Sequence, residues 1–389
     1  MFKKNIKPIL MAGALALATA VSPVLANTPP EAGNNVITTT NDNNGNKTFQ
    51  FTKTFTYAKG ITFPNPTFTY AVDGNGVTGN KKPIVTISDI SFTDTDKKSN
   101  DTDSTVRYEK NGTITISLNS AVPGEYIYTI KENSYTSDDT QAVYVCDSDI
   151  YELHVYVTNI KENGVESVGI SKVTLCEKYI NEDGNVSYGR KVTSLAYENS
   201  YKKDTGSTDA PAFTVTKTVK GDFADKQNDI FDFTITFDLP NDTVSQTYTG
   251  TSTVDVSKLE DDKDDGDTSN NKITYTITDN RPIKFQLQDG DTISFPVLPA
   301  GTTYTISENN LSNGYALTEV KVDGVADNDQ LVSDVLITDT NSHSVEFTNT
   351  KKDTPITGVI VNNMPYIALL GASGAGLVVL AASKKRSKK

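Results

Sequence analysis

The chain has 389 residues, a formal net charge of −13, two cysteines, two histidines and no tryptophan. So few Cys and His residues argue against metal and redox chemistry, and the acidic balance argues against nucleic-acid binding. The many Thr, Val, Tyr and Phe residues favour an all-β protein, and the length favours two domains. We therefore expect a protein without a cofactor or a bound metal.

The N-terminus has the features of a secretory signal peptide. Three lysines in the first seven residues precede an apolar run at 8–21, and a small-residue cleavage site ends at Ala26. An N-terminal membrane anchor is the alternative, but the apolar run is short and the cleavage site is good. We expect 1–26 to be a signal peptide and 27–47, rich in Asn, Thr and Pro, to be a flexible lead that buries no core.

Residues 48–201 form the first predicted domain, because short alternating runs separated by Gly, Asn and Asp are typical of a β-sandwich. Its first strand, 49–57, carries Lys53 on an otherwise apolar face. The other residues of that face are Phe49, Phe51, Phe55 and Tyr57. A lysine placed there loses its hydration, so its ammonium group must find a partner, give up its proton or react.

Two later strands of this domain also carry a polar residue in an apolar row. Glu132 ends one row, and Asn199 lies within another. The rows are Tyr126, Tyr128 and Ile130 for the first strand, and Leu195, Tyr197 and Tyr201 for the second. One face of one domain is therefore expected to carry a lysine, a glutamate and an asparagine.

The same plan repeats in the second half of the chain. Residues 202–211 are predicted to be a polar linker and 212–352 a second domain. Here Lys217 interrupts an apolar row, Glu308 ends one, and Asn349 lies within one. The rows are Phe213, Val215 and Val219; Tyr304 and Ile306; and Val345 and Phe347. The order Lys, Glu, Asn is the same in both halves, which indicates two copies of one module.

Residues 353–389 are predicted to be a cell-wall sorting signal. An apolar segment at 364–382 is followed by a basic tail at 384–389. Alone, that segment would predict a membrane span stopped by cytoplasmic positive charge. A pentapeptide motif precedes it, and its residues are Thr354, Pro355, Ile356, Thr357 and Gly358.

The two Lys, Glu, Asn sets predict a chemical reaction. A buried lysine with a lowered pKa can be neutral, and a neutral amine is a nucleophile that can attack the side-chain amide of Asn. A glutamic acid kept protonated by an apolar pocket can polarise the amide carbonyl and relay the proton. We expect one Lys–Asn isopeptide bond per domain, with Glu132 and Glu308 as the catalytic groups. The alternative is a buried Lys–Glu ion pair in each domain, with Asn bonded to nearby backbone.

A resemblance to a known family rests on the segments that contain these residues. They are 51–55, 128–132 and 197–200 in the first half, and 215–219, 304–308 and 347–349 in the second. With the sorting motif, this ordered set resembles the two-domain major pilins of Gram-positive, sortase-assembled pili, whose modules are streptococcal pilin isopeptide-linkage domains. The resemblance covers nearly the whole mature chain.

The resemblance implies two tandem immunoglobulin-like sandwich domains of the collagen-adhesin B type, followed by a sorting helix. It also implies that a sortase cleaves between Thr357 and Gly358 and passes the acyl group to a lysine of a neighbouring pilin subunit or to peptidoglycan. Thr354 stands where the commonest signal has Leu, which leaves the sortase class open. Lys191 lies near the place that the family uses for the receiving amine, but strand alternation turns it inward, and Lys178 or another lysine is the alternative.

Two weaker signals remain. Cys146 and Cys176 flank the predicted hairpin at 163–164 in a secreted chain, so a disulfide is one expectation and two free thiols the other. The acidic run 261–267 is similar to a Ca²⁺ loop, but Lys263 takes a ligand position, which favours a solvated loop.

Together, the motifs predict a secreted, wall-anchored pilin subunit whose single-turnover chemistry does not make it an enzyme. The alternatives are a monomeric surface adhesin with a host ligand, and a secreted hydrolase, for which no further catalytic constellation exists.

Overall fold

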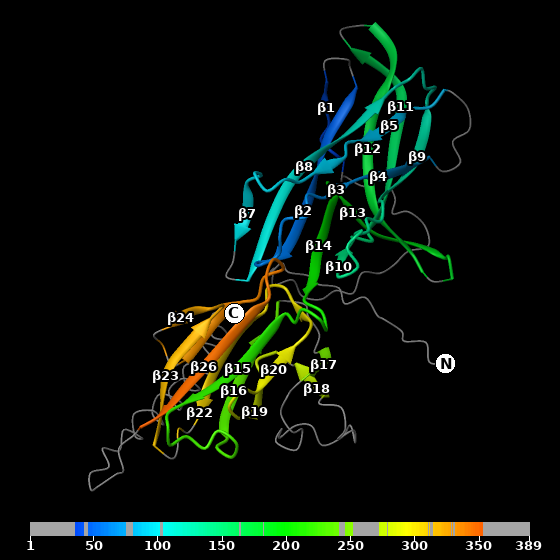
Figure 1. Ribbon diagram of the computed structural model, residues 1–389. Coiled ribbons are helices and arrows are strands. Elements are labelled where there is room, and N and C mark those ends of the chain that lie inside the picture. The colour runs from blue at the N-terminus through cyan, green and yellow to red at the C-terminus, as the bar shows by residue number, and fades with distance from the viewer. Residues whose placement is uncertain are drawn as a thin grey trace.

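The computed structural model describes residues 36–352, apart from 43–45, 75–80, 102–103, 163–164, 182, 241–245, 252–271, 278, 310, 312–313, 328 and 330. Figure 1 shows two β-rich bodies that follow one another along the chain. The described residues form strands and no α-helix, which confirms the all-β prediction. None of them forms a helix that could cross a membrane. The signal peptide, the acidic run at 261–267 and the sorting signal lie outside the described residues.

The first domain is a sandwich of two mostly antiparallel sheets (Figure 1). One sheet has the strand order β10-β14-β2-β8-β5, with β1 beside β2 and β7 beside β8. Its strands are β1 (Thr40–Asn41), β2 (Lys47–Ala58), β5 (Ile84–Ile87), β7 (Lys98–Asp101), β8 (Thr105–Ser117), β10 (Ala142–Val145) and β14 (Ala196–Thr205). The facing sheet, β13-β12-β11-β9-β4, contains β4 (Tyr70–Asp73), β9 (Gly124–Glu132), β11 (Ile150–Glu162), β12 (Val165–Ile180) and β13 (Val186–Val192). A short pair, β3 (Thr67–Phe68) and β6 (Ile90–Ser91), completes the domain.

The second domain is also a sandwich of two sheets. The order β20-β15-β26-β23-β24 joins β15 (Phe213–Lys220), β20 (Thr292–Phe295), β23 (Tyr315–Val322), β24 (Val325–Asp327) and β26 (His343–Lys351). The order β19-β16-β22-β25 joins β16 (Phe231–Asp238), β19 (Pro282–Leu287), β22 (Thr303–Asn309) and β25 (Leu331–Leu336). A further hairpin pairs β17 (Gln246–Thr251) with β18 (Lys272–Ile277), and β21 (Leu298–Pro299) pairs with β14 of the first domain.

Each domain has its own hydrophobic core. The alternation of side chains along β2 and β15 explains which of their residues enter the cores, because every second side chain of a strand points to the same face of its sheet. On β2 the alternation predicts the buried side chains Phe49, Phe51, Lys53, Phe55 and Tyr57, and Thr54 of the opposite face is buried as well. Both cores are rich in aromatic rings that pack edge to face or tilted.

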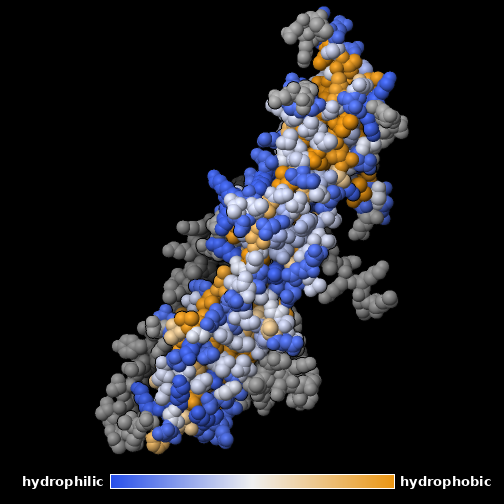
Figure 2. All heavy atoms as spheres, turned by 45° about the horizontal axis from the view of Figure 1, so that its top comes forward, coloured by the Kyte–Doolittle hydropathy of each residue, from blue (hydrophilic) through white to orange (hydrophobic). Residues whose placement is uncertain are grey.

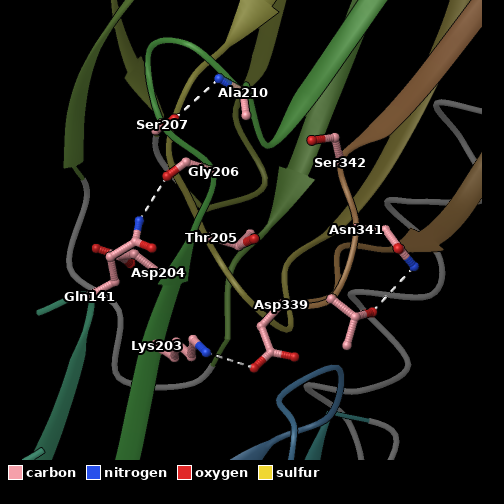
Figure 3. A pocket seen from close by; sticks show the side chains of 11 residues that line it. Gln141, Lys203, Asp204, Thr205, Gly206, Ser207, Ala210, Asp339, Asn341 and Ser342 are labelled. Carbon is pink, nitrogen blue, oxygen red and sulfur yellow. Dashed lines mark hydrogen bonds and ion pairs between the residues drawn. The ribbon is translucent and has the colours of Figure 1, made fainter. Parts of the chain in front are cut away.

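The two domains contact each other through more than the connecting chain. Ala300 of the second domain packs into the core of the first. The backbone N–H and hydroxyl of Thr62 donate to Asp339 Oδ1 at 2.9 and 2.8 Å, and Lys203 Nζ lies 3.2 Å from Asp339 Oδ2. Both residues line a cleft of about 300 Å³ at this joint. Figure 3 shows the side chains that line it.

Apolar and hydrophilic side chains are distributed differently over the surface. On the face shown in Figure 2, apolar side chains gather most densely on the first domain, toward the end away from the joint. Hydrophilic side chains are spread over both domains (Figure 2).

Candidate functional site

The lysine and the asparagine of each set lie on neighbouring parallel strands. In the first domain, β2 and β14 are the first long strand and the last, and Asn199 pairs with Phe55, two residues beyond Lys53. In the second domain, β15 and β26 pair in the same way, and Asn349 pairs with Val219, two residues beyond Lys217. The offset is therefore identical in both domains. It places the lysine and the asparagine diagonally adjacent on the face that points into the core.

The glutamate of each set comes from the facing sheet. Glu132 ends β9, and Glu308 lies near the end of β22. Lys53 Nζ donates to Glu132 Oε2 at 2.5 Å, and Asn199 Nδ2 donates to Glu132 Oε1. Both side chains of the Lys53–Glu132 pair are fully buried. One carboxyl group therefore contacts the lysine amine with one oxygen and the amide nitrogen with the other.

The second domain repeats this arrangement with slightly longer contacts. Lys217 Nζ lies 3.3 Å from Glu308 Oε2 and 3.2 Å from Oε1, and Asn349 Nδ2 donates to Oε1 at 2.5 Å. The side chains of Lys217 and Glu308 are fully buried. In each domain the structure thus brings together the lysine, the glutamate and the asparagine that the sequence singles out.

In both domains, burial favours the neutral form of the lysine and the neutral form of the glutamate. It lowers the pKa of Lys53 and raises the pKa of Glu132, although the attraction between the two opposes each shift. In the second domain, burial lowers the pKa of Lys217 to about 8 and raises that of Glu308. Because burial disfavours both charges, the form with a neutral amine and a neutral carboxylic acid becomes accessible.

An aromatic ring covers each amine, and the sequence did not single these rings out. Lys53 Nζ lies 4.3 Å from the ring centre of Phe68, and Lys217 Nζ lies 4.4 Å from that of Phe231. The rings keep water from the amines, which maintains the low dielectric that lowers their pKa. The alternating row that contains Phe231 was a usable signal, but only the fold shows that Phe231 and Phe68 reach the lysines.

The orientation of the asparagine amides differs from the expectation. We expected the glutamic acid to face the amide carbonyl, whereas it faces the amide nitrogen in both domains. In the first domain the reason is the backbone N–H of Asp147, which donates to Asn199 Oδ1 at 2.8 Å and so fixes the carbonyl on the other side. In the second domain, Asn349 Oδ1 is buried and has no hydrogen-bond partner among the described residues.

The lysines considered for linkage between subunits do not present their amines to solvent. Lys191 lies on β13, and its Nζ is buried. Lys178 is also buried, and its Nζ contacts Glu152 and Thr129, each at 3.2 Å. A register shift in the β12–β13 pairing lies beside both residues. The amine of Lys191 is buried although its strand partner Cys176 faces away from the core, so the structure offers no support for Lys191 as an acceptor.

Of the two alternatives for the cysteines, the structure has two free thiols. Cys146 follows β10 in one sheet and contacts the backbone of Tyr135. Cys176 lies on β12 in the other sheet, where its strand partner is Glu152. The neighbouring Leu175 lies in the core, so strand alternation turns Cys176 to the outer face of its sheet, away from the sheet that Cys146 follows.

Comparisons with known proteins give limited matches. No curated protein matches the chain. A family model described as a domain of unknown function (DUF7601) matches residues 211–351. Among solved structures, the major pilin from Streptococcus pyogenes is 20% identical with a TM-score of 0.32, over 78% of this chain and 98% of that one.

Two further solved structures are similar to parts of the chain. The major pilin T3.2 from Streptococcus pyogenes is 22% identical with a TM-score of 0.31, over 79% of this chain and 98% of that one. A pilus-presented adhesin, Cpa, is 20% identical with a TM-score of 0.28, over 47% of this chain and 37% of that one. Similarities at this level do not assign a function by themselves.

Proposed function

We propose that the protein is a structural subunit of a covalently polymerised pilus on a Gram-positive cell surface. In this proposal each domain is locked by one Lys–Asn isopeptide bond that its own residues form. The observation that carries the proposal is the repetition of a buried Lys, Glu, Asn set in both domains, with the same strand pairing and the same two-residue offset. A buried ion pair alone requires no asparagine at a fixed offset.

The reaction begins with proton transfer from the Lys53 ammonium to Glu132, which the 2.5 Å contact allows. The neutral amine attacks Cγ of Asn199 and forms a C–N bond. Glu132, now a carboxylic acid, gives its proton to Nδ2 and then takes up a second proton from the attacking nitrogen, and Nδ2 leaves as ammonia when its bond to Cγ breaks. The carboxyl group spans donor and leaving group, so one residue serves as both base and acid. Lys217, Glu308 and Asn349 perform the same steps in the second domain.

Attack on the amide places negative charge on the carbonyl oxygen, and the two domains differ at this point. The backbone N–H of Asp147 donates to that oxygen in the first domain and can stabilise the charge as it develops. The side chain of Asp147 holds the donor in place, because Oδ2 accepts from Glu198 N and Oδ1 from Asp149 N, both at 2.7 Å. The described part of the second domain offers Asn349 Oδ1 no such donor.

This difference predicts that the first-domain bond forms faster than the second-domain bond. Asp147→Pro, which removes the N–H, should slow the first bond roughly 100-fold, as expected for the loss of one oxyanion donor. Asp147→Ala keeps the N–H and should slow it less. Mass spectrometry of peptides from each domain after timed synthesis would follow the formation of both bonds. The rate in the second domain would serve as the internal reference. An unchanged first-domain rate in Asp147→Pro, with the domain folded by near-ultraviolet circular dichroism, would exclude this role of the N–H.

The position of the bond suits a subunit that bears tension. The chain enters the second domain through β15 and leaves it through β26, and these two strands are the ones that Lys217 and Asn349 would join. Tension would then pass through the covalent bond and leave the hydrogen-bonded sheets unloaded. Unfolding under force would require the breakage of a covalent bond.

Assembly is proposed to follow the sorting motif, Thr354, Pro355, Ile356, Thr357 and Gly358. A sortase would cleave after Thr357 and transfer the acyl group to an exposed lysine of another subunit, and finally to peptidoglycan. Wall extracts boiled in detergent should then give a ladder of covalent multimers on an immunoblot. A single monomer-sized, wall-attached band would instead favour the monomeric adhesin.

Replacing the acyl donor should abolish that ladder. In Thr357→Ala cells we expect only monomer, in the membrane fraction or the medium, because the bond that the sortase cleaves is no longer recognised. Thr350→Ala, at the end of β26 and outside the motif, is the matched control and should polymerise normally. A normal ladder from Thr357→Ala would show that this motif does not direct assembly.

A further inference from the structure

A buried group of ligand-type side chains lies on the sheet face that points away from the first-domain core. Glu152 and His154 are two residues apart on β11, and Cys176 is the strand partner of Glu152 on β12. Their neighbours Leu153 and Leu175 point the other way, into the core. Although they lie on the outer face, the three residues are only 3%, 7% and 3% exposed. The cross-linking reaction uses none of them.

Other contacts occupy the atoms of these side chains that point away from the group. His154 Nδ1 lies 2.7 Å from Oε1 of Glu125. Lys178 Nζ and the Tyr188 hydroxyl donate to Glu152 Oε2 at 3.2 and 3.3 Å. Three atoms remain and converge, namely His154 Nε2, Glu152 Oε1 and Cys176 Sγ, all within 4.8 Å of one another. A carboxylate on the far nitrogen of a histidine is the arrangement that fixes a metal-binding imidazole.

We propose that Glu152, His154 and Cys176 form a binding site for a divalent transition-metal ion, with zinc as the best match. Imidazole, thiolate and carboxylate are the three side-chain ligands that zinc takes. In a tetrahedral zinc site, neighbouring ligand atoms are roughly 3.3–3.8 Å apart, given the usual bond lengths. Nε2 and Oε1 are already 3.1 Å apart, so the group needs only small side-chain movements. A water molecule would complete the tetrahedron.

The charges of the group are compatible with a dication. The bound form would contain the ion, the Cys176 thiolate, the carboxylates of Glu125 and Glu152, and the Lys178 ammonium, which together are neutral. Ligation would displace the thiol proton and any proton on His154 Nε2, and both would pass to solvent. Such a site would tie β11 to β12, and it departs from the composition-based expectation of a chain without a bound metal.

Metal titration of the purified mature protein tests the proposal. We expect one equivalent of Zn²⁺ by calorimetry after treatment with a chelator, and a thiolate-to-metal charge-transfer band when Co²⁺ is used. Cys176→Ser should abolish the band, and His154→Gln should abolish stoichiometric Zn²⁺ binding. Cys146→Ser, which removes the other thiol of the chain, is the matched control and should bind as the parent does.

Glu125→Gln tests the orienting role of Glu125 separately. It should weaken Zn²⁺ binding roughly 10–100-fold without removing it, as expected for a residue that acts through the histidine. The first-domain cross-link reports independently that each variant has folded. The absence of saturable binding in the folded parent, or stoichiometric binding that survives in both Cys176→Ser and His154→Gln, would show that the group is only a buried hydrogen-bond network.

Discussion

Glu132→Gln and Glu308→Gln are each expected to stop cross-linking in their own domain while the other domain still forms its bond. Glutamine has the size of glutamate and can accept the hydrogen bond from the asparagine amide, but it cannot carry a proton between the amine and the leaving nitrogen. General acid–base catalysis contributes roughly 10²–10⁴-fold, so bond formation should slow by at least about 100-fold. Masses of peptides from each domain, taken over time after synthesis, measure both rates in one molecule.

Matched controls exist on the strands that carry the asparagines. Glu198, on β14, and Glu346, on β26, are exposed and lie outside the buried sets. Glu198→Gln and Glu346→Gln should therefore form both bonds at the parent rate. Wild-type rates in Glu132→Gln and Glu308→Gln would show that these carboxyl groups are not the catalysts.

Asn349→Ala is expected to destabilise the second domain strongly. It blocks the bond but keeps the Lys217–Glu308 pair, and Asn349 Oδ1 loses no partner among the described residues. In the chain-entropy model, a bond that closes a loop of this size contributes about 5 kcal/mol to the free energy of unfolding. That corresponds to a fall of roughly 15–25 °C in the melting temperature of a domain of this size.

Scanning calorimetry of the two-domain protein would separate the effects. Only the second-domain transition should move in Asn349→Ala and only the first in Asn199→Ala, because the cores are separate and distant substitutions add. Asn341→Ala, at an exposed asparagine before β26, should leave both transitions in place. An unchanged second transition in Asn349→Ala, in protein shown by mass to lack the bond, would contradict the stabilising role.

The sequence was sufficient for the parts of the site that depend on strand alternation. Lys53 and Lys217 sit in rows of buried aromatic and β-branched residues, and a half-buried strand has a period of two. The same rule places Asn199 and Asn349 on the core-facing side of their own strands. The parallel pairing of the first and last strands, and the facing sheet that supplies each glutamate, depend on topology, which the pattern does not specify.

The parts that the sequence missed depend on segments brought together by the fold. Asp147 reaches Asn199 from a loop, and Phe68 covers Lys53 from a two-residue strand, so no periodic signal marked either residue. Of the two alternatives for the cysteines, the structure has the free thiols, because proximity to a hairpin does not show which face of a sheet a cysteine joins. For Lys191, the alternation argument assumed one strand running to Asn199, whereas Lys191 lies on β13 and Asn199 on β14 of the other sheet. Its amine is buried on the outer face, where Lys191 is the strand partner of Cys176.

The most direct test of the central claim is the intact mass of the folded, mature protein, measured after denaturation and reduction. Each Lys–Asn bond releases one ammonia, so the protein should be lighter than its sequence by about 34 Da, which is twice the roughly 17 Da of one displaced amide nitrogen with its hydrogens. Lys53→Ala and Lys217→Ala should each prevent one bond independently, so that each variant is lighter than its own sequence by only the roughly 17 Da of the remaining bond. A mass equal to that of the sequence, in protein shown to be folded, would contradict the account and reduce both sets to buried ion pairs.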